Sequence, residues 1–481
     1  KYIDKNIYLV YNRIMTFERS GLLLDKPQTP ASDVGMEESL RRVLEPTSQI
    51  YKKLTISGER KDDVLDSLHS GDSPDMTATH LSESELDIQL AKLKKWKNAL
   101  LEVEDLDPLI RQAYRWRINE DIANVHMLRA SAAGDMRSFR RWNEFIYGKP
   151  NEPIYRAALD WVAGDADSLI DQFGVDSPQG QAAQSVLDNI GARRGDRSLL
   201  VPSEETFQSV RTDHMREGGY YSLLLAGVEV PTEAKVRRDV GEPILRHVVT
   251  NNLQSDYDIK PVEGTVWGVD HVERVVEQPE EYAMPPKRFV GLGAGHEIGT
   301  HLLEKENGDR GPIKLASRGL DRQEVGEGRA VVREQVVYDT FDEFGTLVRW
   351  RDIIRRDIAI GFASGVADER MRTAAETYDF IYAIDLMYQT KLKPNDPEVA
   401  AEKAKRKTDP LILRVLKGTD GTGGAYLKDK LYLEGNVAVW RAAEMYGPGI
   451  ISDGDLGKFD ITNSRHIVLL QKLGLLPSYG D

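Results

Sequence analysis

The chain has 481 residues, which exceeds a typical domain length of about 150 residues and predicts two or three structural units. Hydrophobic residues make up 40% of the sequence and charged residues 30%, a composition that argues against disorder along the whole chain. The 64 basic and 78 acidic residues give a formal net charge of -14. This charge opposes nonspecific attraction to nucleic acid or to anionic membranes, and we expect neither as a partner.

Cysteine is absent, which excludes disulfides, cysteine nucleophiles and thiolate metal sites. A transition metal would therefore bind mainly through histidine and carboxylate side chains. The longest apolar stretches, such as residues 220–228, are far shorter than the roughly 20 residues that span a bilayer, so no transmembrane helix is expected. The opening residues KYIDKNIYLVYNRIM lack the apolar segment and cleavage site of a signal peptide, which favours a cytoplasmic location.

Residues 1–173 are predicted to form a helical N-terminal region. Apolar residues recur at helical spacing in four stretches, namely 35–54 (with an interruption at Pro46), 86–103, 107–145 and 154–173. Between the first two stretches, residues 61–84 are acidic and rich in Ser, Asp and Gly, which predicts an exposed loop or a poorly ordered insertion. Residues 174–200 are rich in Gly, Ser and Gln and are predicted to be a linker or loop.

Residues 201–481 are predicted to form the second unit. Ser203 is a candidate N-cap for a helix that runs toward Tyr221, and the Val-rich residues 262–277 predict a strand or hairpin. The sequence thus predicts an α+β fold that is mainly helical, and it predicts no particular oligomeric state.

The segment GHEIGTHLLE, residues 295–304, carries the sharpest chemical signal because it places His296, Glu297 and His301 within six residues. In the familiar zinc-peptidase motif the histidines lie four residues apart, and both reach one ion from the same helix face. Here the spacing is five, which turns about 140° on a regular α-helix. Joint ligation therefore predicts a bulged or widened turn, which Gly299 makes easier.

A third ligand is expected from residues 321–335, which look helical and contain Glu324, Glu327 and Glu334. Glu327 and Glu334 are seven residues apart and share one helix face. One of them could complete a site of two histidines and one glutamate while the other supports it by hydrogen bonding. The alternative is an acidic helix that faces solvent. His271 is either a further ligand or substrate contact, or simply a polar residue with a satisfied hydrogen bond.

Three strings occur in order, namely HEIGTHLLEKENG (296–308), GEGRAVVRE (326–334) and GGAYLKDKLYLEG (423–435). Over roughly residues 285–435 they resemble the family that contains the microtubule-associated tyrosine carboxypeptidases. The bacterial members of that family are described as flavohemoglobin expression-modulating proteins with a QEGLA motif.

The resemblance implies a zinc metallopeptidase of the HExxxH kind, in which His296, His301 and Glu327 hold Zn²⁺ and Glu297 is the general base. The QEGLA-like segment departs from the pattern, with Gly326 for Gln and Arg329 for Leu. Arg329 could orient a carboxylate, bind substrate or merely face solvent, and we expect the last. The acidity of the chain argues against an acidic tubulin tail as substrate unless the cleft is locally basic.

Zinc-activated hydrolysis also needs a donor for the oxyanion, for which Tyr432 is the candidate. A carboxypeptidase must recognise a free carboxylate, and Arg414 and Lys428 flank a Gly-rich turn from which they could bind it. Each could instead be an ordinary surface cation. The preferred function is a zinc carboxypeptidase that acts on the C-terminus of a peptide or protein. The alternatives are a zinc endopeptidase and a noncatalytic regulatory protein that retains the fold.

Overall fold

The computed structural model describes residues 54–476 except 57, 79–81, 104–105, 233–234, 265–266 and 321–324. Most of the described chain is helical, and the strands form one three-stranded and one two-stranded sheet. The expectation of a mainly helical α+β fold is confirmed. The helix expected at residues 35–54 lies, except for its last residue, outside the described residues.

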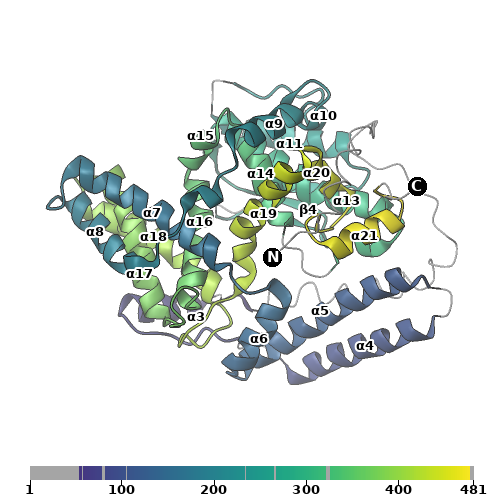
Figure 1. Cartoon of the computed structure of the whole chain (residues 1–481), viewed down its shortest axis with the longest axis horizontal. Helices are drawn as coiled ribbons and strands as arrows, with labels where there is room; N and C mark the ends of the chain where they lie inside the picture. Colours follow the sequence, from purple (N-terminus) through teal and green to yellow (C-terminus); the bar gives the residue numbers. More distant parts are fainter. Residues whose placement is uncertain are drawn as a thin grey trace.

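Three helices near the N-terminus pack together at the lower right of Figure 1, namely α4 (Glu83–Glu102), α5 (Pro108–Ala132) and α6 (Met136–Tyr147). They confirm the helices expected at 86–103 and 107–145. Asp107 caps α5 by accepting a hydrogen bond from the Leu109 amide at 2.8 Å, and a proline follows it at the first helical position. The core of this group also includes residues of α21 (Ser464–Lys472).

The expectation of a loop or insertion at residues 61–84 is wrong for its first part, where α3 (Glu59–His69) lies, whereas residues 70–78 form neither helix nor strand. Val64 and Leu68, four residues apart, bury one face of α3 in the main core, while its acidic side chains face outward. Further on, Met76 is fully buried and exchanges backbone hydrogen bonds with Gly418 and Thr419. A short apolar face is therefore sufficient to hold this acid-rich segment against the main core.

The left side of Figure 1 holds the helices α7 (Glu152–Phe173), α8 (Pro178–Ile190), α17 (Ala374–Leu392) and α18 (Pro397–Leu416). α7 confirms the helix expected at 154–173. The loop expected at 174–200 is largely helical instead, since α8 packs on α7 and α17 through Ala183, Val186 and Ile190. Ser177 and a following proline start α8, which the Gly- and Ser-rich composition concealed.

Two helices follow in the next part of the chain, α9 (Glu204–Met215) and α10 (Tyr220–Leu224). The expected cap at Ser203 is confirmed, because its hydroxyl accepts a hydrogen bond from the Thr206 amide at 3.2 Å. After α11 (Arg238–Asn252) the chain enters the sheets.

In the larger sheet the central strand β4 (Val275–Pro279) is parallel to β2 (Asp258–Val262) and antiparallel to β3 (Gly268–Asp270). The β3–β4 pair confirms the expected hairpin. β1 (Val236–Arg237) and β5 (Ala283–Met284) form the smaller, antiparallel sheet.

The elements around the candidate site are a π-helix (Val290–Leu302), α13 (Leu303–Arg310), α14 (Gly326–Val336), α16 (Val348–Ala363) and α19 (Lys430–Tyr446). The remaining short helices are η2 (Gly191–Arg193), η3 (Arg197–Leu200), α12 (Pro286–Phe289), η5 (Lys314–Ser317), α15 (Phe341–Gly345), η6 (Leu427–Asp429), α20 (Gly449–Asp453) and η7 (Gly454–Leu456).

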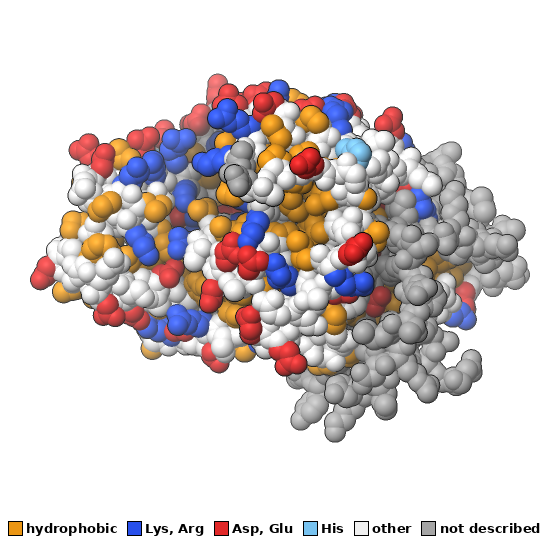
Figure 2. All heavy atoms as spheres, turned by 90° about the horizontal axis from the view of Figure 1, so that it is seen from above, with side chains coloured by type: hydrophobic (Ala, Val, Ile, Leu, Met, Phe, Trp, Pro, Cys, Tyr) orange, Lys and Arg blue, Asp and Glu red, His pale blue; other side chains and the backbone are white. Residues whose placement is uncertain are grey.

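The larger core joins residues from both sides of the segment 174–200, including Tyr155 of α7 and Trp440 of α19. The two expected regions thus pack against each other, and their division into separate units stays a prediction. In the part of the chain that the structure describes, every helix is too short or too polar to cross a bilayer. Figure 2 shows acidic and basic side chains interspersed over one face, with hydrophobic side chains gathered in its middle.

Candidate metal centre

The motif histidines lie on the π-helix Val290–Leu302, so the expected widened turn is confirmed. At its end the Leu303 amide bonds to the Ile298 carbonyl, five residues back, as in a π-helix. Because a π-turn contains about one residue more than an α-turn, residues five apart return to one face. The rings of His296 and His301 accordingly lie with their centroids 5.0 Å apart.

Glycines of the π-helix admit close packing against α10. A side chain at Gly295 would place its Cβ 2.2 Å from the Tyr221 hydroxyl oxygen, and one at Gly299 would lie 1.8 Å from that of Tyr220. Gly299 therefore has a packing role besides easing the distortion, since neither tyrosine could keep its place beside a larger residue.

Side-chain donors satisfy carbonyl groups of the widened helix. The Thr300 hydroxyl donates to the Gly295 carbonyl at 2.9 Å, and Nη1 of Arg333 donates to the Gly299 carbonyl at 2.7 Å. Arg333 is held by two further bonds to Asp455, at 2.8 and 2.7 Å. Neither Thr300 nor Arg333 was predicted from the sequence to be a residue of the site.

Glu327 of α14 comes close to both histidines. Its Oε2 atom lies 3.7 Å from Nε2 of His296 and 3.5 Å from Nε2 of His301. Ligand atoms at ordinary zinc distances in a tetrahedral site are about 3.3–3.5 Å apart, so these three atoms are spaced nearly as one ion requires. The Glu327 oxygen is also buried and lacks a hydrogen-bond partner, which fits an atom that binds a cation.

Glu297 is the second carboxylate beside the histidines. Only 5% of its surface is exposed, and its Oε1 atom lies 3.8 Å from Nε2 of His296. His296, Glu297 and His301 each place one ligand atom within 4.8 Å of the others, so Glu297 could also bind a metal. Glu327 fits better as the third ligand because one of its oxygens approaches both histidines.

Glu334 lies in the supporting position that the sequence predicted for one of the two glutamates. Its Oε1 accepts a hydrogen bond from Nδ1 of His296 at 2.6 Å, and only 4% of its surface is exposed. This bond fixes the tautomer and directs the lone pair of Nε2 toward Glu327. Glu324, the third glutamate considered, lies outside the described residues.

Charges within the site reinforce one another. Burial opposes ionisation of Glu327, but His301 and His296 outweigh it and hold the pKa of this carboxyl well below its usual value. Burial also opposes protonation of His301, yet the Glu327 carboxylate raises its pKa. Glu297 differs, because burial outweighs the charges of His296 and His301 and raises the pKa of its carboxyl. A raised pKa suits a carboxylate that accepts protons near neutral pH.

The expectation that Arg329 faces solvent is wrong. Only 1% of its surface is exposed, and its guanidinium pairs with Glu304 and, at 3.2 Å, with Asp455. Arg329 and Arg333 are four residues apart, so they lie on the same face of α14 and converge on the same carboxylate. The four-residue spacing of the two arginines was the only sign in the sequence that they share a partner. That partner, Asp455, lies more than a hundred residues further along the chain and could not be identified from the spacing.

Tyr432 and Arg414 lie together on the Glu327 side of the site. The Arg414 guanidinium is 5.7 Å from the centre of the Tyr432 ring, and it is bound to Asp429 by a pair of hydrogen bonds. Burial and the charge of Glu327 raise the pKa of Tyr432. Arg414 is thus more than an isolated surface cation.

Lys428 is partly buried, and its positive charge helps to lower the pKa of Glu327, after the larger effects of burial and the two histidines. Tyr432, Arg414 and Lys428, three residues expected in substrate recognition or catalysis, thus all lie within electrostatic reach of Glu327.

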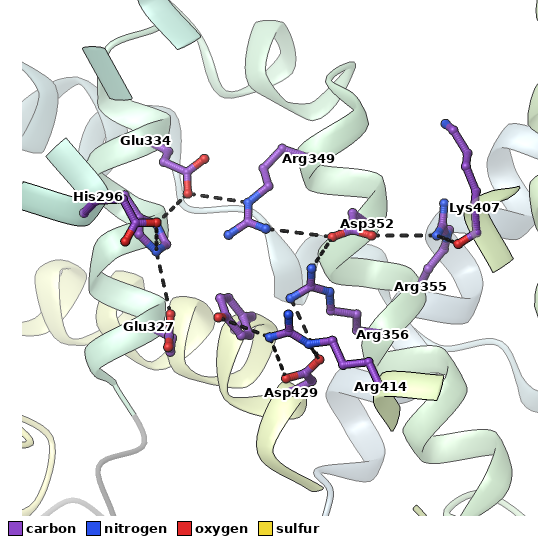
Figure 3. A network of polar contacts seen from close by, with 12 residues as sticks. His296, Glu327, Glu334, Arg349, Asp352, Arg355, Arg356, Lys407, Arg414 and Asp429 are labelled. Atoms are coloured by element: carbon purple, nitrogen blue, oxygen red, sulfur yellow. Dashed lines mark hydrogen bonds and ion pairs between the residues drawn. The ribbon is translucent and has the colours of Figure 1, made fainter. Parts of the chain in front are cut away.

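Two further arginines of α16 lie beside Tyr432 and were missed by the sequence analysis. The guanidinium carbons of Arg349 and Arg356 are 5.4 and 5.0 Å from the ring centre. Figure 3 shows these side chains next to Arg414, with His296, Glu327 and Glu334 on the adjoining side. The segment RWRDIIRRD (349–357) carried the signal, but only the fold brings it to the metal centre.

His271 is hydrogen-bonded, which agrees with the simpler of its two interpretations. Its Nδ1 lies 3.2 Å from the Tyr257 hydroxyl and its Nε2 3.4 Å from Nζ of Lys458. Burial, then the charges of Lys458 and His301, lower the pKa of His271 well below its usual value.

Comparison with family models, curated proteins and solved structures found no match for this chain. The family resemblance noted from the three motifs therefore stays a prediction, and any functional assignment depends on the residues themselves.

Proposed function

We propose that this protein is a zinc-dependent peptidase in which His296, His301 and Glu327 bind the metal and Glu297 is the general base. The observation that carries the proposal is the position of the Glu327 carboxylate oxygen, buried without a hydrogen-bond partner and within 3.7 Å of both histidine nitrogens. Two imidazoles and one carboxylate form a common donor set of catalytic zinc sites, which keep one position for water.

Bound zinc would lower the pKa of a water molecule toward neutrality and polarise the substrate carbonyl. Glu297 would accept a proton from water in the site and pass it to the leaving amine, which is general acid–base catalysis by one carboxylate. The Tyr432 hydroxyl donates a hydrogen bond to the developing oxyanion. Glu334 holds His296 in the tautomer whose Nε2 is free to bind metal.

A carboxypeptidase is the preferred activity, and the substrate is the C-terminus of a peptide or protein. It is supported by the cations Arg414 and Lys428, both of which interact with the charge of Glu327. A free carboxylate bound by these groups would place the last peptide bond near the metal ligands. Local positive charge also offsets the net charge of -14, which would otherwise repel an anionic terminus.

Metal removal tests the proposal. We expect about one zinc per chain in the purified protein, as in mononuclear peptidase sites, and strongly reduced zinc in His296→Ala, His301→Ala and Glu327→Ala. Elemental mass spectrometry measures this directly. His247→Ala and Glu273→Ala are matched controls, because both residues are exposed and outside the site. Absence of zinc from the wild type after zinc is supplied would contradict the proposal and favour the noncatalytic regulator.

Glu297→Gln separates metal binding from catalysis. We expect this variant to retain zinc while its kcat/KM on peptides falls by about 10²–10⁴-fold, because the amide cannot accept the water proton. Full activity of the variant would contradict the role of Glu297 as base. Release of the last residue from free peptides but not from C-terminally amidated ones would support a carboxypeptidase, whereas cleavage at internal bonds of both would support an endopeptidase.

A further inference from the structure

The first turn of α14, which carries Glu327, lies directly against the backbone of α19, and Figure 1 shows the two helices side by side. A side chain at Gly328 would place its Cβ 2.0 Å from the Gly435 carbonyl carbon and 2.2 Å from the Asn436 amide nitrogen. Two helix backbones can approach this closely only where a glycine lies at the crossing. The residue that follows Glu327 is therefore held in contact with α19.

A buried amide network joins the same two helices. Nδ2 of Asn436 donates to the Gly328 carbonyl at 3.3 Å and to Oε1 of Gln335 at 2.9 Å. Nε2 of Gln335 donates back to Oδ1 of Asn436 at 3.2 Å. Both side chains are fully buried, so a lost bond would leave a polar group without water or protein to replace its partner. The network thus fixes where α14 lies along α19.

Trp440 belongs to this network but does not reach the start of α14. Its Nε1 donates to Oε1 of Gln335 at 2.7 Å, and its side chain is buried as well. Among the three side chains of the network, Asn436 alone bonds to the backbone beside Glu327. This difference separates a residue that positions the ligand from one that only stabilises the helix pair.

A second close contact joins α14 to the π-helix that carries the histidines. A Cβ at Gly291 would lie 3.1 Å from Cα of Glu334, the residue whose carboxylate accepts the hydrogen bond from His296. α14 therefore touches the π-helix at one glycine and α19 at another. The separation of Glu327 from the histidines is set by these backbone contacts.

The crossing also relates Glu327 to Tyr432. Tyr432 lies about one turn before Gly435 on α19, and the charge of Glu327 contributes to its raised pKa. Gly328 belongs to the string GEGRAVVRE and Gly435 ends the string GGAYLKDKLYLEG. The two strings, far apart in the chain, thus meet at one helix crossing beside the candidate metal centre.

We propose that Asn436 is a positioning residue of the metal centre, which acts with the Gly328–Gly435 contact to hold Glu327 at its distance from the histidines. Its hydrogen bonds go to Gly328 and Gln335, so it acts through the backbone of α14. The role rests on the proposed zinc site, and it extends that site to a residue that binds neither metal nor substrate.

Zinc affinity of the full chain tests the proposal without turnover. In Asn436→Leu, which removes the amide at similar volume, we expect zinc affinity in competition with a chelator to fall by about tenfold or more. Asn436→Ser, which keeps one short donor, and Gly328→Ala, which forces the helices apart, should lower it in the same direction. The milder Ser variant keeps the test available if the other two do not fold.

Trp440→Phe is the matched control, because it removes a buried hydrogen bond of the same network away from Gly328. Urea unfolding of the metal-free chain should show lower stability in Trp440→Phe as well as in Asn436→Leu, while only the latter loses zinc affinity. Equal loss of zinc affinity in both variants would contradict a specific role for Asn436. Reduced stability of Asn436→Leu with unchanged zinc affinity would refute the positioning role.

Cobalt in place of zinc gives a spectroscopic readout, because the visible absorption of Co²⁺ depends on the number and arrangement of its ligands. We expect this spectrum to change in Asn436→Leu and to stay as in the wild type in Trp440→Phe. The outcomes also separate the two proposals. A wild type that binds zinc but hydrolyses no peptide would overturn the peptidase and leave the positioning role standing, whereas zinc affinity insensitive to Asn436 would do the reverse.

Discussion

Glu334 shows how one residue beyond the ligands sets the chemistry of the site. Its hydrogen bond to Nδ1 of His296 leaves Nε2 as the metal-binding atom, and the same buried oxygen also lies 3.5 Å from Nε of Arg349. Loss of such a partner typically weakens metal affinity by about 10–100-fold.

We therefore expect Glu334→Ala to weaken zinc binding by about this factor, and Glu334→Gln by less, because the amide oxygen can still accept the hydrogen bond. Chelator competition measures both affinities, and excess zinc should restore activity to the Ala variant. The exposed Glu273→Ala serves as control. Equal zinc affinity in Glu334→Ala and wild type would show that the bond to His296 has no part in metal binding.

The residues closest to the chemistry were the most predictable, because their spacing along the chain is itself the signal. The five-residue interval between His296 and His301 predicted a widened turn, and the structure has a π-helix there. Arg329 was misjudged because a helical position does not reveal what covers it, and its partner Asp455 comes from a distant part of the chain. Arg349 and Arg356 were missed for the same reason.

At the scale of elements, the π-helix depends on α14 behind it. Arg333 donates to the Gly299 carbonyl, pairs with Asp455 and stacks on Tyr220 with its guanidinium carbon 3.9 Å from the ring centre. Its side chain is fully buried, so removing the charge would leave both the carbonyl and part of Asp455 unpaired.

We expect Arg333→Met to lower the free energy of unfolding by about 3–5 kcal/mol, as breaking a buried ion pair does. Urea unfolding of the metal-free protein measures this loss separately from zinc binding. Arg441→Met is the control, because Arg441 pairs with Glu444 at the surface and should change stability by less than about 1 kcal/mol. A similar small change in Arg333→Met would mean that the π-helix does not need this support.

Helices were predicted correctly where the apolar periodicity extends over many residues. The prediction failed where that periodicity is short. α5 and α7 carry many buried positions and were expected from the sequence. α3 buries only Val64 and Leu68, and α8 begins in a Gly- and Ser-rich stretch, so composition outweighed periodicity in both segments. Their helical state depends on packing against helices that are remote in the chain.

At the scale of the whole molecule, the larger core encloses ionisable groups that folding has removed from water. His214 of α9 is one of them, and it lies fully buried with its ring 5.4 Å from that of Tyr220. Its Nδ1 bonds to the Val210 carbonyl at 3.0 Å, while its Nε2 is buried without a hydrogen-bond partner. Burial, reinforced by the charge of Arg333, lowers the pKa of His214 to about 4.

The pH dependence of stability follows from this shift. An unfolded histidine has a pKa of about 6.5, so between pH 6.5 and 4 the unfolded state binds a proton that the folded state rejects. His214 therefore lowers the free energy of unfolding as the pH falls through this window, by at most about 1.4 kcal/mol per pH unit. Above pH 6.5 the residue is neutral in both states and the contribution of its protonation vanishes.

We expect His214→Gln to flatten the loss of stability between pH 6.5 and 4 relative to the wild type, because glutamine does not titrate. Urea unfolding at a series of pH values measures the free energy of unfolding of both proteins. The quantity to compare is the slope of this free energy against pH, not the stability of either protein at one pH. His247→Gln, at an exposed position, should leave the wild-type slope unchanged. If the slopes of His214→Gln and wild type coincide, other buried groups govern the acid response of the fold.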